Sequence, residues 1–155
     1  MLSQEKLTIF LLRVSLGWLY FYSGITKVLD PAWSAEGFLK SAKTFSVFYT
    51  WLASPELLPL TNFVNKWALL FLGISLLLGV FVRLSSVLGV ALMFLYYLPI
   101  LTFPYIGKNY FLIDEHVIFS IALLVLASAQ AGKTWGLESW RLKMLKFPGK
   151  DARNV

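Results

Sequence analysis

Four stretches of the chain are almost continuously apolar and long enough to cross a lipid bilayer. A hydrocarbon core of ~30 Å requires roughly 20 helical residues, and the four stretches cover residues 7–29, 63–82, 84–103 and 112–131. Since lipid offers no partner to backbone polar groups, each stretch is expected to be a helix. The pattern predicts an all-α integral membrane protein, a four-helix bundle formed by a single domain over residues 1–155.

Two further segments, residues 34–53 and 136–147, alternate apolar and polar residues at helical spacing. The first predicts an amphipathic helix that lies on the membrane surface or closes over a ligand site as a lid. The second carries an apolar stripe among basic residues and predicts a tail helix on anionic lipid. Docking of this tail helix to a partner protein is the alternative.

The composition fits the membrane class. Of the 155 residues, 58% are hydrophobic and 14% are charged, more apolar surface than a soluble domain of this size can bury. The absence of cysteine excludes disulfides, thiolate metal sites and cysteine-ligated iron–sulfur clusters. We expect the first apolar stretch to be retained, because no small-residue cleavage site follows it promptly.

The basic residues predict the orientation of the chain. Four spans put both termini on one side, together with Lys6, Arg83, Lys133 and the basic tail, while Lys40, Lys43 and Lys108 lie on the other. Positive loops stay in the cytoplasm, so we expect cytoplasmic termini. The net charge of +6 is then a topology signal and a lipid contact, and it does not indicate nucleic-acid binding.

The third apolar stretch contains Pro99 and Pro104 near its end. Proline removes a helical hydrogen bond and clashes with the preceding turn. We therefore expect this helix either to end or to kink near these two residues.

One face of the first stretch carries five residues of functional interest, because their spacing of four and three keeps them within roughly 80° of arc. These are Arg13, Gly17, Tyr20, Gly24 and Lys27. Glycines let a second helix approach closely. Cations within a span normally face the protein interior or reach the headgroups.

Three ionisable residues, Asp114, Glu115 and His116, stand at the start of the last apolar stretch. Acidic residues stabilise a helix N-terminus through its dipole, which accounts for the first two and less well for His116. Two roles for His116 stay open: a structural pairing with a carboxylate, and handling protons or binding a ligand. Lys27 reaches the same end of the protein, so a carboxylate of this group could neutralise it. That pairing would leave a polar pocket beneath the amphipathic helix, with Tyr20, Tyr96, Tyr97 and Trp33 as candidate walls.

Three segments resemble the DoxX/DoxD family of small four-span membrane proteins: LRVSLGWLYFYSGITKVLDP (12–31), LLLGVFVRLSSVLGVALM (76–93) and NYFLIDEHVIFSIALLVLASAQAGKTWGL (109–137). The resemblance implies a helical bundle in a prokaryotic cytoplasmic membrane. Some relatives are small subunits of thiosulfate:quinone oxidoreductase that work with a second subunit, and others are associated with redox complexes. Members often have a glutamate opening the second span, where this chain has Asn62, Asn65 and Lys66.

Two functions follow as expectations. The first is a subunit of a quinone-linked oxidoreductase, possibly of thiosulfate:quinone type, in which His116 with Asp114 or Glu115 supplies a proton. In this interpretation Tyr20, Tyr96 and Tyr97 line a slot for the quinone, and Lys27, Lys108 and Arg13 are the candidates for binding a small anion. No metal, flavin or haem site is evident in the sequence. The second function is a non-catalytic accessory subunit that anchors a larger membrane complex.

Overall fold

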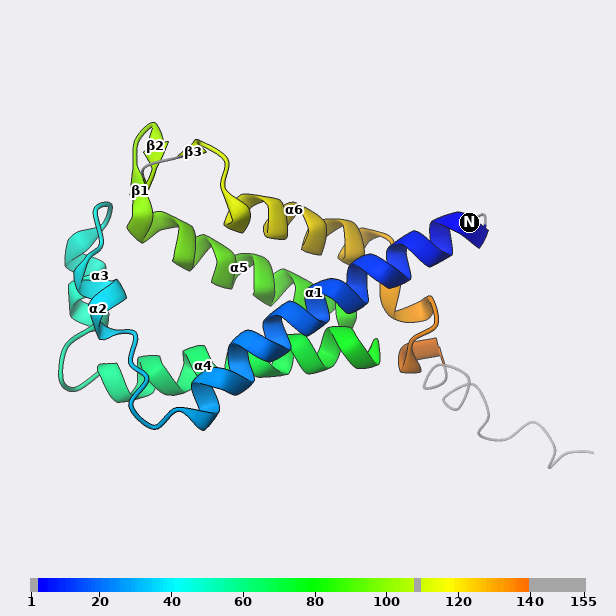
Figure 1. Ribbon diagram of the computed structural model, residues 1–155, viewed down its shortest axis with the longest axis horizontal. Helices are drawn as coiled ribbons and strands as arrows, with labels where there is room; N and C mark the ends of the chain where they lie inside the picture. Colours follow the sequence, from blue (N-terminus) through cyan, green and yellow to red (C-terminus); the bar gives the residue numbers. More distant parts are fainter. Residues whose placement is uncertain (1–2, 108–109, 140–155) are drawn as a thin grey trace, which may run out of the picture.

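The computed structural model describes residues 3–107 and 110–139 (Figure 1). Four longer helices form the body of the protein: α1 (Ser3–Leu29), α4 (Leu58–Leu78), α5 (Val82–Ile100) and α6 (Glu115–Ser128). Two short helices, α2 (Glu36–Lys40) and α3 (Ser46–Leu52), connect α1 to α4. Three two-residue strands, β1 (Leu101–Thr102), β2 (Tyr105–Ile106) and β3 (Tyr110–Phe111), connect α5 to α6, and a 3₁₀ helix, η1 (Ala131–Lys133), follows α6.

Three of the four predicted spans are helices long and apolar enough to cross a membrane, namely α1, α4 and α5. The fourth, α6, has 14 residues, which at about 1.5 Å per residue is roughly 21 Å, short of the ~30 Å hydrocarbon core. Asp114 caps its N-terminus, and Gln130 adopts a left-handed conformation just after its end. The prediction of a full-length fourth span over 112–131 is therefore wrong in its boundaries, because both flanks of the apolar run leave the helix.

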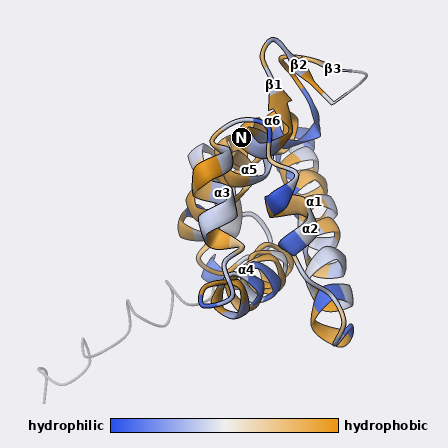
Figure 2. Cartoon of the chain, turned by 90° about the vertical axis from the view of Figure 1, so that its left-hand side faces the viewer, coloured by the Kyte–Doolittle hydropathy of each residue, from blue (hydrophilic) through white to orange (hydrophobic). Residues whose placement is uncertain are grey.

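Hydrophobic residues make up much of the helices (Figure 2), and many of them are exposed on the outside. Large side chains on every long helix are more than half exposed, among them Trp18, Phe71, Leu88 and Ile121. Burial of apolar surface drives folding in water, so a face of this kind requires lipid around it. The protein is a membrane protein with many of its large apolar side chains exposed on the outside.

Glycines bring α1 and α4 into close contact. A Cβ on Gly24 would overlap the backbone of Leu70, and one on Gly73 would overlap the backbone of Phe21. The predicted face of α1 is buried at Arg13, Gly17, Tyr20 and Gly24, as the helical spacing requires. One hydrophobic core joins α1 to the other long helices through Leu16, Tyr20, Leu69, Leu72, Leu76, Val82, Met93, Leu123 and Leu126.

The most extensive helix contacts are those of α1 with α4 and of α5 with α6, whereas α4 and α5 contact each other far less. These two helices meet at the turn Gly79–Phe81, which we call the turn end, and diverge toward α2 and α3 (Figure 1). The opposite end, which carries α2, α3 and the strands, we call the cap end. Ser75 Oγ and Ser85 Oγ lie 2.7 Å apart in a hydrogen bond near the turn.

At the cap end, the predicted single amphipathic helix over 34–53 is wrong: the segment forms α2 and α3 with a break between them. The break is used to cap α5, because Lys43 N donates to Pro99 O at 2.8 Å and Thr44 Oγ1 donates to Leu101 O at 2.6 Å. Helix C-termini leave carbonyl groups without partners, and the unwound residues satisfy them. The need of the α5 C-terminus for hydrogen-bond donors therefore outweighs the helical spacing of apolar residues in segment 34–53.

Helix α5 ends one residue after Pro99, which confirms that this proline marks the end of the third span. Proline has no N–H to donate to the carbonyl four residues earlier, and that carbonyl, Leu95 O, instead accepts a hydrogen bond from the Tyr49 hydroxyl at 3.0 Å. Burial raises the pKa of Tyr49, so the hydroxyl keeps the proton that it donates. Helix α3 is attached to α5 by this bond.

The strands β1, β2 and β3 form a small antiparallel sheet in sequence order, an addition to the all-α class that the sequence predicts. The predicted tail helix over 136–147 lies largely outside the described residues, of which 137–139 are helical.

Candidate functional site

A pocket of about 280 Å³ opens between the four long helices, and we call it the polar chamber. It receives side chains from α1, α4, α5 and α6, so it exists only in the folded protein. Five of the predicted site residues line it together: Tyr20, Lys27, Tyr96, Glu115 and His116. Apolar residues such as Leu69, Met93 and Phe119 form the rest of its wall.

Lys27 enters the chamber from the last turn of α1. Its ammonium group donates to Asn65 Oδ1 at 3.3 Å and lies 4.9 Å from the Trp33 ring centroid and 5.6 Å from that of Tyr96. Aromatic faces attract a cation, but they do not neutralise it. Within the described residues no carboxylate forms an ion pair with Lys27. The predicted pairing of Lys27 with Asp114 or Glu115 is therefore not formed.

Asp114 is engaged elsewhere, as the N-cap of α6. Its Oδ1 accepts hydrogen bonds from His116 N at 3.0 Å and Val117 N at 3.3 Å, while its Oδ2 lies 2.6 Å from His116 Nδ1. The carboxylate is only 3% exposed. Because these three contacts occupy it, Asp114 cannot also reach Lys27. The prediction that Asp114 stabilises the N-terminus of the helix is confirmed, whereas its predicted pairing with Lys27 is wrong; the same carboxylate also orients the histidine.

His116 faces the chamber with one ring nitrogen committed. An ionised carboxylate only accepts hydrogen bonds, so contact with Asp114 Oδ2 makes Nδ1 the protonated nitrogen and leaves Nε2 for a ligand. The imidazole side chain is 18% exposed, and it stands edge-on to the Tyr96 ring, 6.0 Å away between centroids. Glu115, the neighbouring carboxylate, is exposed at the mouth of the chamber.

Two phenol groups complete the polar lining. The hydroxyls of Tyr20 and Tyr96 are buried and have no hydrogen-bond partner among the described residues. The side-chain amide of Asn65 lies near the Tyr96 hydroxyl. Leaving a buried hydroxyl without a partner costs about 1–3 kcal/mol.

The remaining predicted residues lie outside the chamber. Arg13 is at the turn end, fully buried, and its guanidinium donates to Leu76 O at 3.1 Å and to Thr134 O and Trp135 O at 3.3 Å each. It fastens the C-terminus of α4 to the segment after η1, where a cation suits the helix dipole. The Tyr97 hydroxyl donates to Leu112 O at 2.8 Å. Lys108 lies outside the described residues.

Asn65 is a site residue that the sequence reasoning missed. It contacts Lys27 directly, and neighbouring Asn62 accepts a hydrogen bond from Ala35 N at 2.9 Å through Oδ1. The sequence does contain a signal for this site, because the two asparagines lie three residues apart, on one helical face, at the start of an apolar span. In the sequence the two asparagines stand out only as a departure from the family pattern. In the structure Asn65 is the hydrogen-bond partner of Lys27.

The fold and the chamber define a helical membrane protein in which three helices are long enough to span a bilayer and a partly polar pocket lies between the four long helices. A comparison with protein-family profiles matches residues 8–101 to the DoxX family, and the chain belongs to that family. The match includes Tyr20, Lys27 and Tyr96 and ends before Asp114. No match is found among curated proteins or among solved structures.

Proposed function

We propose that the chain is the membrane subunit of a quinone-linked oxidoreductase and that the polar chamber binds the quinone ring. The observation that supports this proposal is that residues with unused hydrogen-bond donors line one pocket. Among the residues that the structure describes, the Lys27 ammonium has no carboxylate partner, and the hydroxyls of Tyr20 and Tyr96 have no hydrogen-bond partner. The two carbonyl oxygens of a quinone are acceptors that these groups would bind.

The proposed chemistry needs a proton source as well as donors. A quinone takes up two electrons and two protons to become the quinol. His116, oriented by Asp114, would first take up a proton at Nε2 and then donate it to one quinone oxygen. Glu115, exposed beside it, would relay that proton and the second one from the surface. The electrons would come from a partner subunit that oxidises a small reductant. With thiosulfate, two ions joined by a sulfur–sulfur bond give tetrathionate and release the two electrons.

A small anion such as thiosulfate is the second ligand class that Lys27 suits, because the ammonium is the one charged donor in the chamber whose partner is a neutral amide. We further propose that the cap end faces away from the cytoplasm. The orientation rests on the distribution of basic residues along the sequence, and it would put the chamber near the outer face of a prokaryotic cytoplasmic membrane.

Purification in mild detergent tests the proposal. The wild-type protein is expected to retain quinone that solvent extraction and mass spectrometry detect. Lys27→Met and His116→Ala are expected to lose most of it, whereas Lys43→Met, which alters an exposed lysine outside the chamber, should retain it. Competition of thiosulfate with the bound quinone would identify the anion as a ligand of the same chamber.

The opposite result has a definite meaning. If the protein carries a stoichiometric partner protein but no quinone, and His116→Ala changes neither property, the chain is the accessory subunit that anchors a larger complex.

A further inference from the structure

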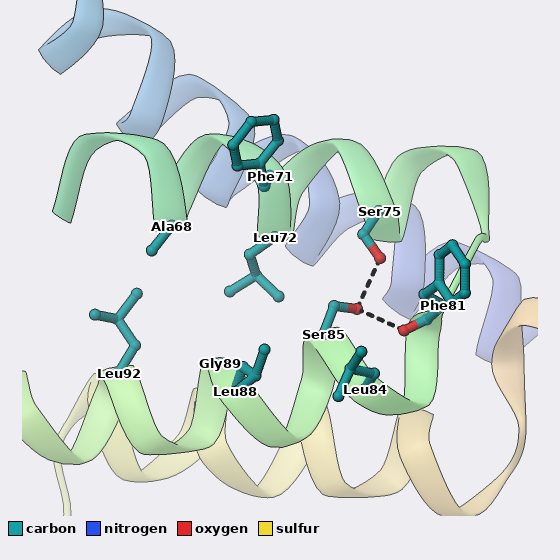
Figure 3. Close-up of a pocket in the computed structure, with 10 residues that line it drawn as sticks. All are labelled: Ala68, Phe71, Leu72, Ser75, Phe81, Leu84, Ser85, Leu88, Gly89 and Leu92. Atoms are coloured by element: carbon teal, nitrogen blue, oxygen red, sulfur yellow. Dashed lines mark hydrogen bonds between the residues drawn. The ribbon is translucent and has the colours of Figure 1, made fainter. Parts of the chain in front are cut away.

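A long apolar groove of about 430 Å³ runs between α4 and α5 (Figure 3). Its walls include Phe71 and Leu72 from α4 and Leu84, Leu88 and Leu92 from α5. The groove is open to the surroundings, because the side chains of Phe71, Leu84 and Leu88 are 60%, 60% and 62% exposed. In a membrane these surroundings are lipid.

The groove presents no free polar group that could select a polar occupant. Its serines, Ser75 and Ser85, bond to each other and to backbone carbonyl oxygens of the α4–α5 turn (Figure 3). The same hydrogen bonds tie the two helices together at the turn end, so the groove is closed there. An occupant of the groove would make contact with hydrocarbon side chains alone.

In the other direction the groove leads toward the polar chamber. A second apolar pocket of about 340 Å³ lies under α2 and α3, and it shares Leu92 with the groove and Tyr96 with the chamber. Asn65 also lines this second pocket, and its Oδ1 accepts the hydrogen bond from Lys27 Nζ at the edge of the chamber. Groove, pocket and chamber therefore follow one another along α5, over roughly 18 Å between Leu84 and Tyr96 at about 1.5 Å per residue.

We propose that the groove between α4 and α5 holds the hydrocarbon tail of the ligand whose ring occupies the polar chamber. This inference rests on the proposed function, and it narrows the ligand to a quinone with a tail of several isoprene units. The ring would enter the chamber beside Asn65 and Tyr96, while the tail stays between the two helices in contact with lipid. A ligand bound in this way can enter sideways from the bilayer without leaving the membrane.

The shape of the groove favours a thin chain over another helix. Helix–helix interfaces in membranes are rich in small residues that let backbones approach. Here Phe71, Leu84 and Leu88 form the exposed rim, and their bulk would hold a second helix away from the floor of the groove. A flexible hydrocarbon chain can lie between them.

Binding of two quinone probes to the purified full-length protein tests the inference. The probes share the dimethoxy-methyl-benzoquinone ring, and one carries a decyl tail while the other has none. Leu88→Trp fills the groove far from the chamber, and Leu124→Trp is the matched control, on the exposed face of α6 and outside these pockets. Leu88→Trp is expected to weaken binding of the decyl probe about tenfold or more, because apolar contact is lost. It should change binding of the tailless probe less than about twofold.

The outcomes separate the two proposals. If Leu88→Trp binds both probes as the wild type does, the tail does not use the groove, although the chamber still binds the ring. If neither probe binds the wild-type protein, the proposed function itself fails. A change of oligomeric state in Leu88→Trp, with unchanged binding of both probes, would make the groove an interface between copies and overturn the inference.

A labelling experiment on the wild type keeps the inference testable even if Leu88→Trp does not fold. A quinone with a photoreactive diazirine at the end of its tail is expected to label peptides that contain residues 82–92. Labelling confined to α6 or to the exposed face of α1 would contradict the inference.

Discussion

Helix α1 carries two cations on one face, and the protein treats them in opposite ways. At the turn end, Arg13 is completely buried and donates to three backbone carbonyl oxygens. At the cap end, Lys27 has one hydrogen bond, to a neutral amide, and two aromatic rings beside it. Both terminal nitrogens of the Arg13 guanidinium are engaged, and only its buried Nε has no partner among the described residues, whereas Lys27 lines a pocket and has donors to spare. The number of hydrogen bonds that a cation already makes, rather than its charge or its depth in the protein, distinguishes a structural cation from a candidate binding residue.

Removing Arg13 should therefore have the largest effect on stability. Arg13→Met removes the buried donor of three carbonyl oxygens and is expected to destabilise the protein by about 3 kcal/mol or more. Arg13→Lys keeps the charge but loses the planar fork of donors, so it should recover only part of the loss. Thermal unfolding in detergent measures both variants, and a wild-type melting temperature for Arg13→Met would show that the carbonyl contacts are not important.

The packing between the two cations should give the next effect. Gly24→Leu places a side chain against the backbone of Leu70 and is expected to cost about 2–3 kcal/mol, as overpacking does. Gly37→Leu is the control, because nothing lies within 4 Å of the added Cβ at that position. The same unfolding measurement applies, and equal melting temperatures for the two variants would contradict the close contact of α1 with α4.

A smaller loss is expected for Tyr49→Phe, which removes the hydrogen bond of 3.0 Å that Leu95 O accepts beside Pro99. The expected cost is about 1 kcal/mol, the usual net value of such a bond. Because burial raises the pKa of Tyr49 above its ordinary 10.0, ionisation favours the unfolded state as the pH rises past that ordinary value. The difference in stability between the two proteins should therefore shrink above that pH, and a difference that grows would contradict the assignment.

The smallest expected effect is the coupling between Lys27 and Asp114. Because no ion pair joins them, Lys27→Met and Asp114→Asn should lower stability additively, within about 0.5 kcal/mol, in a double-mutant cycle. Lys27→Met alone should cost less than about 1 kcal/mol, in contrast to Arg13→Met. A coupling energy clearly above this range would restore the charge pairing that the sequence suggested.

Much of the site was accessible from the sequence, although its contacts were not. Helical spacing identified Arg13, Tyr20 and Lys27 as one face of α1, and the residue pattern before α6 drew attention to His116. The predicted ion pair of Lys27 with Asp114 or Glu115 was wrong, because opposite charge at the same end of the protein does not specify a contact. Short-range bonds from the α6 backbone and from His116 had already occupied that carboxylate.

The sequence by itself determined that this is a membrane protein, which three helices are long and apolar enough to span a bilayer, and which face of α1 is buried. These properties depend on apolar length and helical period, both of which are local. Only the tertiary structure decided that residues 34–53 break into α2 and α3, that Lys27 meets Asn65, and that chamber and groove lie along α5. Each of these outcomes depends on a backbone or side-chain group far away in the chain, and no local pattern encodes which distant donor will satisfy a given acceptor.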